Sequence, residues 1–342
     1  QVRQVSLSDN VPSTLSIGIG QGASSLQESE KMARQALEMA LGRGGDQVAI
    51  KSGSSFSFYG GTSKGVEKHT KVKTRIMASA LAELIGTAEN VLIMGHQFAD
   101  LDCLGSAVGM YKAVRQMGKP AAIVLNRQRN LAFPLYNRLA QNGYADAFVE
   151  PDLAVDLIGK KTLLVVVDTH LPHILESREV YNACKTVVVI DHHRKMVGHI
   201  DNAVIFYHEP YASSASEMVT ELVQYFGDNV KIGKMEAEAL LSGIMLDTKN
   251  FVMKTGVRTF EAAAYLRKQG ADTVEVRKLF SNSMDDYQKK TRLVASAEIY
   301  RGCAIASGEY SEDIKLIAPQ AADELPSGGA GRAPPGRPGG GP

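Results

Sequence analysis

The segment Thr186-Val-Val-Val-Ile-Asp-His-His-Arg194 indicates the fold of this chain. Its run of β-branched residues is typical of a strand that is buried on both faces of a parallel sheet. Residues 162–167 form a second such run, and a third strand is predicted over residues 91–94, before the polar loop 95–102. The pattern predicts an α/β protein whose chemistry lies at the carboxyl ends of parallel strands.

Outside these strands, the sequence changes character several times along its length. Helices are expected over 76–85, 104–117, 214–225 and 235–246, and a further strand over 121–125. The predicted parts are an α/β segment at 1–51, a linker at 52–75, the main α/β domain at 76–250, a helical connector at 251–297, the start of another domain at 298–325 and a disordered Gly/Pro tail at 326–342.

The composition is that of an ordinary globular protein, with 342 residues, 44% hydrophobic and 22% charged. Its net charge of +1 argues against a surface built mainly to bind nucleic acid or acidic membranes. Its three cysteines suggest neither a disulfide framework nor a zinc module, which favours a reducing, cytosolic setting. No apolar run approaches the ~18 residues that span a bilayer. Because the first residue is Gln1 and not Met, we expect the sequence to begin inside a longer chain, in which a membrane anchor could lie upstream.

Carboxylates and imidazoles follow three of the predicted strands and one helix. Each alone could be a helix cap or a turn former, but gathered at one sheet edge they are costly unless a cation compensates them. The sequence therefore predicts two divalent metal ions, an arrangement suited to in-line attack on a phosphoester. The mixture of ligands favours Mn²⁺ over Mg²⁺ or Ca²⁺. The candidate residues are His96, Asp100, Asp102, Asp168, Asp191, His192, His193 and Asp247.

In order along the chain, these motifs resemble the DHH phosphoesterase superfamily. The resemblance rests on His-x-x-x-Asp-x-Asp at 96–102, the strand-terminal Asp168, Asp-His-His at 191–193 and the later Asp247. Residues 94–107 and 188–194 are most similar to the GdpP-type cyclic-di-AMP phosphodiesterases. Residues 13–51 resemble the end of the degenerate GGDEF domain that precedes the catalytic region in that family.

The resemblance implies a metal centre with six ligands. His96 and Asp100 would hold the first Mn²⁺, Asp168 would bridge, and the second Mn²⁺ would be held by Asp102, His192 and Asp247.

The resemblance also implies roles around the substrate. His193 would act near the scissile phosphate as a hydrogen-bond or proton donor, alongside Asp168 as the other catalytic residue. Asp191 would orient His192 from behind. Arg194 would contact a phosphate, with a surface salt bridge as the alternative.

By resemblance, the expected reaction is hydrolysis of cyclic di-AMP to linear pApA. The alternatives are another DHH activity on short oligonucleotides, pAp or polyphosphate, and a nucleotide-sensing module with impaired catalysis. A cyclic dinucleotide is the expected partner, together with a homodimer and no long nucleic acid. The full-length protein is expected at the cytoplasmic face of the membrane through upstream helices, and this fragment is expected to be soluble.

One departure from the family concerns substrate binding. The family's C-terminal associated domain carries a Gly-Gly-Gly-His loop that grips the nucleotide, but this chain has no histidine after His208. The Ser-Gly-Gly-Ala-Gly sequence at 327–331 supplies only glycines. We therefore expect the associated domain to be cut short after Leu325, with metal binding retained and nucleotide affinity affected.

Overall fold

The structure is a computed structural model that describes residues 14–60, 71–280, 284–300 and 303–306. Two compact units divide the chain, one up to Leu279 and one from Phe280 onward. Among the helices in the described ranges, none combines the length and the apolar character that a bilayer crossing requires.

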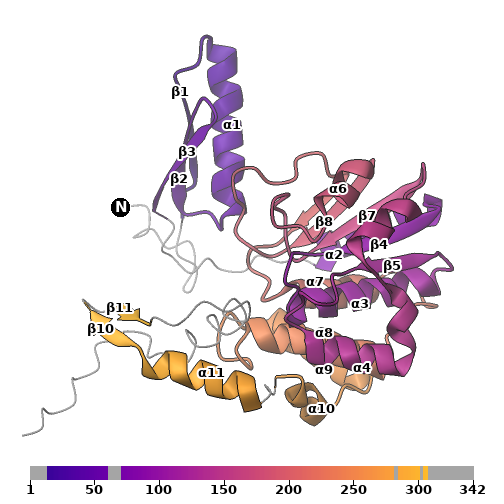
Figure 1. The fold of residues 1–342 in the computed structure, drawn as a ribbon. Helices are drawn as coiled ribbons and strands as arrows, with labels where there is room; N and C mark the ends of the chain where they lie inside the picture. Colours follow the sequence, from indigo (N-terminus) through magenta and orange to yellow (C-terminus); the bar gives the residue numbers. More distant parts are fainter. Residues whose placement is uncertain (1–13, 61–70, 281–283, 301–302, 307–342) are drawn as a thin grey trace, which may run out of the picture. The chain divides into compact units, whose positions relative to one another are not determined.

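A six-stranded sheet, parallel throughout, forms the centre of the first unit (Figure 1). Its strand order is β6-β5-β4-β7-β8-β9. The strands β7 and β8 are the two continuous aliphatic runs, and every residue of β7 is buried. The strands are β4 (Asn90–Met94), β5 (Ala121–Val124), β6 (Phe148–Val149), β7 (Thr162–Val167), β8 (Thr186–Asp191) and β9 (Ile205–His208).

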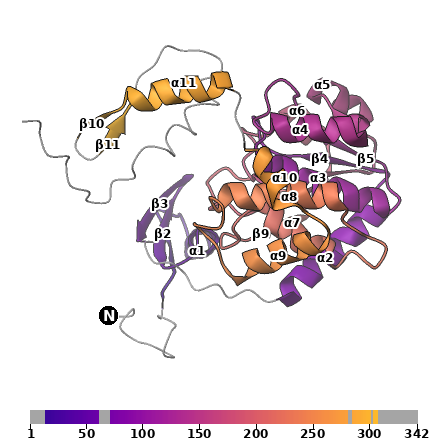
Figure 2. The same ribbon diagram turned by 90° about the horizontal axis from the view of Figure 1, so that it is seen from below.

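Helices cover both faces of this sheet, as βαβ connections require. One core, which includes Leu164, Val166 and Val189, packs under α5 and α6. The alternate strand residues point to the opposite face, where α3, α7 and α8 lie side by side (Figure 2). The helices are α2 (Lys71–Thr87), α3 (Leu101–Gln116), α4 (Phe133–Leu139), α5 (Pro151–Ala154), α6 (Arg178–Ala183), α7 (Ala215–Val223) and α8 (Lys234–Asp247), with short turns at Ala140–Tyr144, Ala145–Ala147 and Val155–Leu157.

The N-terminal segment is a separate three-stranded sheet with one helix. Strands β1 (Ile17–Gln21) and β2 (Gln47–Ser52) are parallel, with α1 (Leu26–Gly42) between them in sequence. Strand β3 (Ser55–Gly60) pairs with β2 antiparallel, although these residues were predicted as part of a linker. The linker prediction followed the Ser, Gly and Lys of the longer range and missed the alternation of Ser and Phe in β3, in which Phe56 and Phe58 are half-buried.

The range 251–297, which was predicted as a helical connector, is helical but is divided between the two units. Helices α9 (Val257–Lys268) and α10 (Thr273–Lys278) pack against α8 and belong to the first unit. In the second unit, α11 (Met284–Ala295) precedes the antiparallel pair β10 (Glu298–Tyr300) and β11 (Cys303–Ile305). The glycine-rich stretch at 327–331 and the predicted tail lie outside the described residues.

Close packing of α3 against α8 depends on Gly105. A Cβ at this position would lie 2.4 Å from the carbonyl oxygen of Ala239 in α8. We expect Gly105→Ala to destabilise the protein by about 1–3 kcal/mol, because backbone atoms would have to move. At about 2–4 °C per kcal/mol, thermal denaturation should show a lower Tm.

Gly86 in α2 provides the matched control, because no atom lies within 4 Å of its added Cβ. Gly86→Ala should stabilise the protein by about 0.5–1 kcal/mol through lower backbone entropy in the unfolded chain. Equal melting of Gly105→Ala and the wild type would show that the two helices can separate at little cost.

Candidate metal centre

The loop after β4 brings the first polar residues to the edge of the sheet. His96 donates from Nδ1 to the carbonyl oxygen of Gln97 at 2.8 Å, in the tautomer that leaves Nε2 as the coordinating atom. That Nε2 lies 3.9 Å from Oδ1 of Asp100. Asp100 is also the N-cap of α3, and its Oδ1 accepts from the amides of Asp102 and Cys103. The cap therefore fixes the start of α3 against the loop.

Asp102 is fully buried and is held by the amino end of α7. Its two carboxylate oxygens accept from the amides of Ala215 at 2.7 Å and Ser216 at 2.8 Å. Free amides at a helix start stabilise a negative charge. Burial, followed by the nearby Asp168 and Asp247, nevertheless raises the pKa of Asp102. Four carboxylates in one site thus leave the negative charge only partly compensated.

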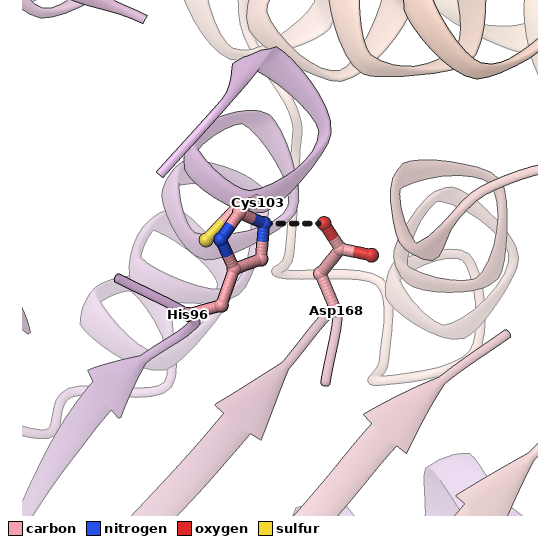
Figure 3. A group of neighbouring side chains, drawn as sticks. All are labelled: His96, Cys103 and Asp168. Carbon is pink, nitrogen blue, oxygen red and sulfur yellow. Dashed lines mark ion pairs between the residues drawn. The ribbon is translucent and has the colours of Figure 1, made fainter. Parts of the chain in front are cut away.

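Asp168 stands at the centre of the site, directly after β7. Its Oδ2 lies 3.4 Å from Nε2 of His96, the ion pair that is dashed in Figure 3. Its Oδ1 lies 3.4 Å from Nε2 of His192. Asp168 has a φ of 59°, a left-handed conformation that non-glycine residues seldom adopt and that clusters at functional sites. The carboxylate thus faces two imidazoles that come from different strands.

The second imidazole, His192, also meets the end of α8. Its Nε2 lies 3.1 Å from Oδ2 of Asp247 and 3.8 Å from Oδ2 of Asp102. Although burial lowers it, the pKa of His192 is raised by Asp168 and Asp247. The six side chains that were predicted to hold metals therefore meet at one sheet edge.

Two buried atoms at the centre indicate that a cation fits this group of residues. Oδ1 of Asp168 and Nε2 of His192 have no hydrogen-bond partner within the described part of the chain. Burial and Asp168 raise the pKa of Asp100 to about 6, because neighbouring carboxylates repel one another. A divalent cation would accept the lone pairs of these atoms and offset the repulsion.

Asp191 has different partners from the one that was expected. Its carboxylate is hydrogen-bonded to Nδ1 of the buried His170 and, at 2.8 Å, to Nδ1 of His193, whereas it was predicted to orient His192. The reason is the tight turn that follows β8, in which Oδ1 of Asp191 also accepts from the backbone amide of His193 at 3.2 Å. Burial by itself would raise the pKa of Asp191. The hydrogen bonds from the two imidazoles together have the larger effect, so the pKa of Asp191 is lowered.

His170 is a functional candidate that the sequence analysis did not select. It is buried, and its Nε2 accepts from the amide of Met196 at 2.9 Å, so its proton is on Nδ1. The signal was available, because His170 follows Asp168 by two residues in the same strand-end motif. His170 and Asp191 together fix the ring of His193.

The remaining predicted contact, Arg194, has an exposed side chain. It forms no ion pair with a carboxylate in the residues that the structure describes, so its predicted phosphate contact stays a prediction. Ser214 caps α7 by accepting from the amide of Glu217 at 3.0 Å, as serine commonly does at the start of a helix.

Glu176 is a half-buried residue beside the centre, and its Oε2 atom is buried. Its amide donates to the carbonyl oxygen of Gly95, and its Oε2 has no hydrogen-bond partner among the described residues. Burial raises the pKa of Glu176 to about 7. The folded protein therefore retains a proton that the unfolded chain releases, and the free energy of unfolding should fall as the pH rises from about 4.5 to about 7.

Glu176→Gln should remove this contribution. Between pH 5 and pH 8, the free energy of unfolding of the variant should rise relative to that of the wild type by on the order of 1–3 kcal/mol. Urea denaturation at a series of pH values measures the free energy of unfolding of both proteins. The other titrating groups contribute equally to both, so their effect cancels in the difference. A difference that does not vary with pH would contradict the raised pKa.

Comparison with known proteins agrees with this fold. Residues 90–244 match the DHH family, N-terminal domain. Residues 1–58 match the GGDEF domain described as cyclic-di-AMP phosphodiesterase GdpP-like. The predicted resemblance to GdpP-type proteins is therefore confirmed.

Individual relatives give the same result. The chain is 46% identical over 333 residues to the cyclic-di-AMP phosphodiesterase GdpP of Geobacillus thermodenitrificans, covering 95% of this chain and 50% of that protein. It is 41% identical to the cyclic-di-AMP phosphodiesterase PdeA of Listeria monocytogenes with the same shares covered. The chain thus spans about half the length of these curated relatives.

A solved structure confirms the predicted fold class. An exopolyphosphatase-related protein from Bacteroides fragilis superposes with a TM-score of 0.59 at 20% identity, covering 71% of this chain and 72% of that protein. At this identity the likeness concerns the fold alone.

Proposed function

We propose that the DHH domain of this chain is a Mn²⁺-dependent phosphodiesterase that hydrolyses cyclic di-AMP to linear pApA. The observation that carries the proposal is the meeting of His96, Asp168 and His192 with three further carboxylates at one sheet edge. The substrate class is supported by the relatives named cyclic-di-AMP phosphodiesterases.

The residues divide into two groups around Asp168. His96 and Asp100 would hold one cation, Asp102, His192 and Asp247 would hold the other, and Asp168 would contact both. Such a cation pair supplies Lewis-acid activation of a phosphate oxygen and of a water molecule. The amides of α7 orient Asp102, and the cap of α3 orients Asp100, so both carboxylates are positioned before a ligand binds.

His193 would move the proton. Its Nδ1 is bound to Asp191, which leaves Nε2 as the nitrogen that can serve a substrate. Burial lowers the pKa of His193, but Asp191 and Asp168 together raise it above the ordinary value for an imidazole, which favours the protonated form. A protonated imidazole can donate to the oxygen that leaves phosphorus when the ring opens.

The direct test uses the protein freed of metal with a chelator. Hydrolysis of cyclic di-AMP to pApA should require added Mn²⁺, and Asp168→Ala should remove it. Mn²⁺ should also raise the free energy of unfolding by about 2.7 kcal/mol at a hundredfold excess over its Kd. Turnover without any divalent cation would refute the metal proposal.

A substrate panel of pAp, a short oligonucleotide and polyphosphate tests the class of substrate. Preference for any of these over cyclic di-AMP would keep the metal centre and overturn the proposed nucleotide. Tight binding of cyclic di-AMP with bound Mn²⁺ but no product would instead indicate a nucleotide-sensing module.

A further inference from the structure

Cys103 brings a sulfur atom to the metal centre. It lies in the first turn of α3 and is 2% exposed. A ring nitrogen of His96, Sγ of Cys103 and a carboxylate oxygen of Asp168 all lie within 4.8 Å of one another (Figure 3). These three atoms offer nitrogen, sulfur and oxygen to a single ion.

The position of the sulfur is built into the backbone around it. A Cβ on Gly95 would lie 2.1 Å from Sγ, so any larger residue there would displace the thiol. The amide of Cys103 donates to Asp100 at 3.0 Å, which fixes the start of the helix. The thiol is therefore held between the end of β4 and the start of α3.

The surrounding groups also favour a cation at this corner. Asp168 is 3% exposed, and its Oδ1 is one of the buried atoms without a hydrogen-bond partner in the described residues. Binding of a cation to the sulfur would release the thiol proton to solvent.

We propose that Cys103 is an additional ligand, through which the position between His96 and Asp168 selects a thiophilic divalent cation such as Zn²⁺ or Cd²⁺. Thiolate and imidazole suit zinc, whereas a hard ion such as Mn²⁺ is satisfied by carboxylate and imidazole. The inference rests on the proposed metal centre and is independent of which nucleotide is hydrolysed. Zn²⁺ thereby competes with Mn²⁺ for this position through a ligand that Mn²⁺ does not need.

Cobalt spectroscopy tests the ligand without reference to activity. Co²⁺ bound by the metal-free protein should show visible d–d bands together with a near-ultraviolet sulfur-to-cobalt charge-transfer band. Cys103→Ser should keep the d–d bands and lose the charge-transfer band. The controls are Cys184→Ser, which removes another buried thiol, and Cys303→Ser, which removes an exposed one. Both should keep the band.

A competition experiment measures the selectivity. The free Mn²⁺ signal in electron paramagnetic resonance reports displacement of Mn²⁺ by added Zn²⁺. Cys103→Ser should weaken Zn²⁺ binding by about 10–100-fold, the range seen when a metal's protein surroundings are altered, with Mn²⁺ binding unchanged.

The outcomes separate this inference from the proposed function. Bound Co²⁺ without a charge-transfer band in the wild type overturns the role of Cys103 and leaves the metal centre standing, whether or not any variant folds. Retention of the band in Cys103→Ser overturns it as well. No binding of Co²⁺ or Mn²⁺ to the wild type refutes the metal centre and, with it, this inference.

Discussion

Asp168→Asn is expected to reduce turnover of cyclic di-AMP by about a thousandfold or more, because a metal centre contributes several kcal/mol to the transition state. The carboxylate faces Nε2 of His96 with one oxygen and Nε2 of His192 with the other. An amide has nearly the same shape but lacks the charge and one acceptor, so it cannot serve two cations. Asparagine also tolerates the left-handed backbone that this position requires, which makes it a better variant than alanine.

Loss of metal and loss of folding must be distinguished in this variant. Asp168→Asn should keep a cooperative thermal transition, while the Mn²⁺-dependent increase in Tm should become much smaller than in the wild type. Asp228→Asn is the control, because Asp228 is exposed and lies away from the centre in the loop before α8. Full activity of Asp168→Asn with a normal Mn²⁺ effect would show that the carboxylate is not a ligand.

The main ligand candidates of this site directly follow buried strands, and the ends of these strands can be predicted from the sequence. Continuous Val, Ile and Leu runs define β7 and β8, and a parallel sheet brings the residues after them to one edge. Asp168 and His192 were placed near His96 on this ground, and the structure brings them together. The fold class was predictable for the same reason, since buried strands and intervening amphipathic helices leave few arrangements.

Other contacts depend on side-chain direction and on distant elements, which the local pattern does not carry. That Asp102 accepts from Ala215 and Ser216 requires α7 to begin opposite α3, more than a hundred residues away. The pairing of Asp191 with His170 instead of His192 depends on which side each residue faces at the end of β8. The number of cysteines suggested neither a disulfide framework nor a zinc module, whereas the neighbours that the fold gives to Cys103 make it a candidate ligand.

His193→Gln tests the proton transfer separately from the metal centre. Unlike His192, whose side chain is 2% exposed, the His193 side chain is 53% exposed and can reach a substrate. We expect kcat to fall by about 10²–10⁴-fold, the usual contribution of a general acid. The Mn²⁺-dependent rise in Tm should be retained, because His193 is not among the proposed ligands.

The pH profile and a companion variant distinguish donation of a proton from simple contact. The wild-type kcat should fall at high pH as His193 loses its proton, and this limb should be absent from the residual activity of His193→Gln. Asp191→Asn should lower kcat by a smaller factor, about 10–100-fold, because it loosens the ring that His170 and Asp191 fix without removing it. His173→Gln, an exposed histidine outside the centre, should behave as the wild type. If His193→Gln loses the Mn²⁺ effect as well as turnover, the imidazole holds a metal and the proton comes from another group.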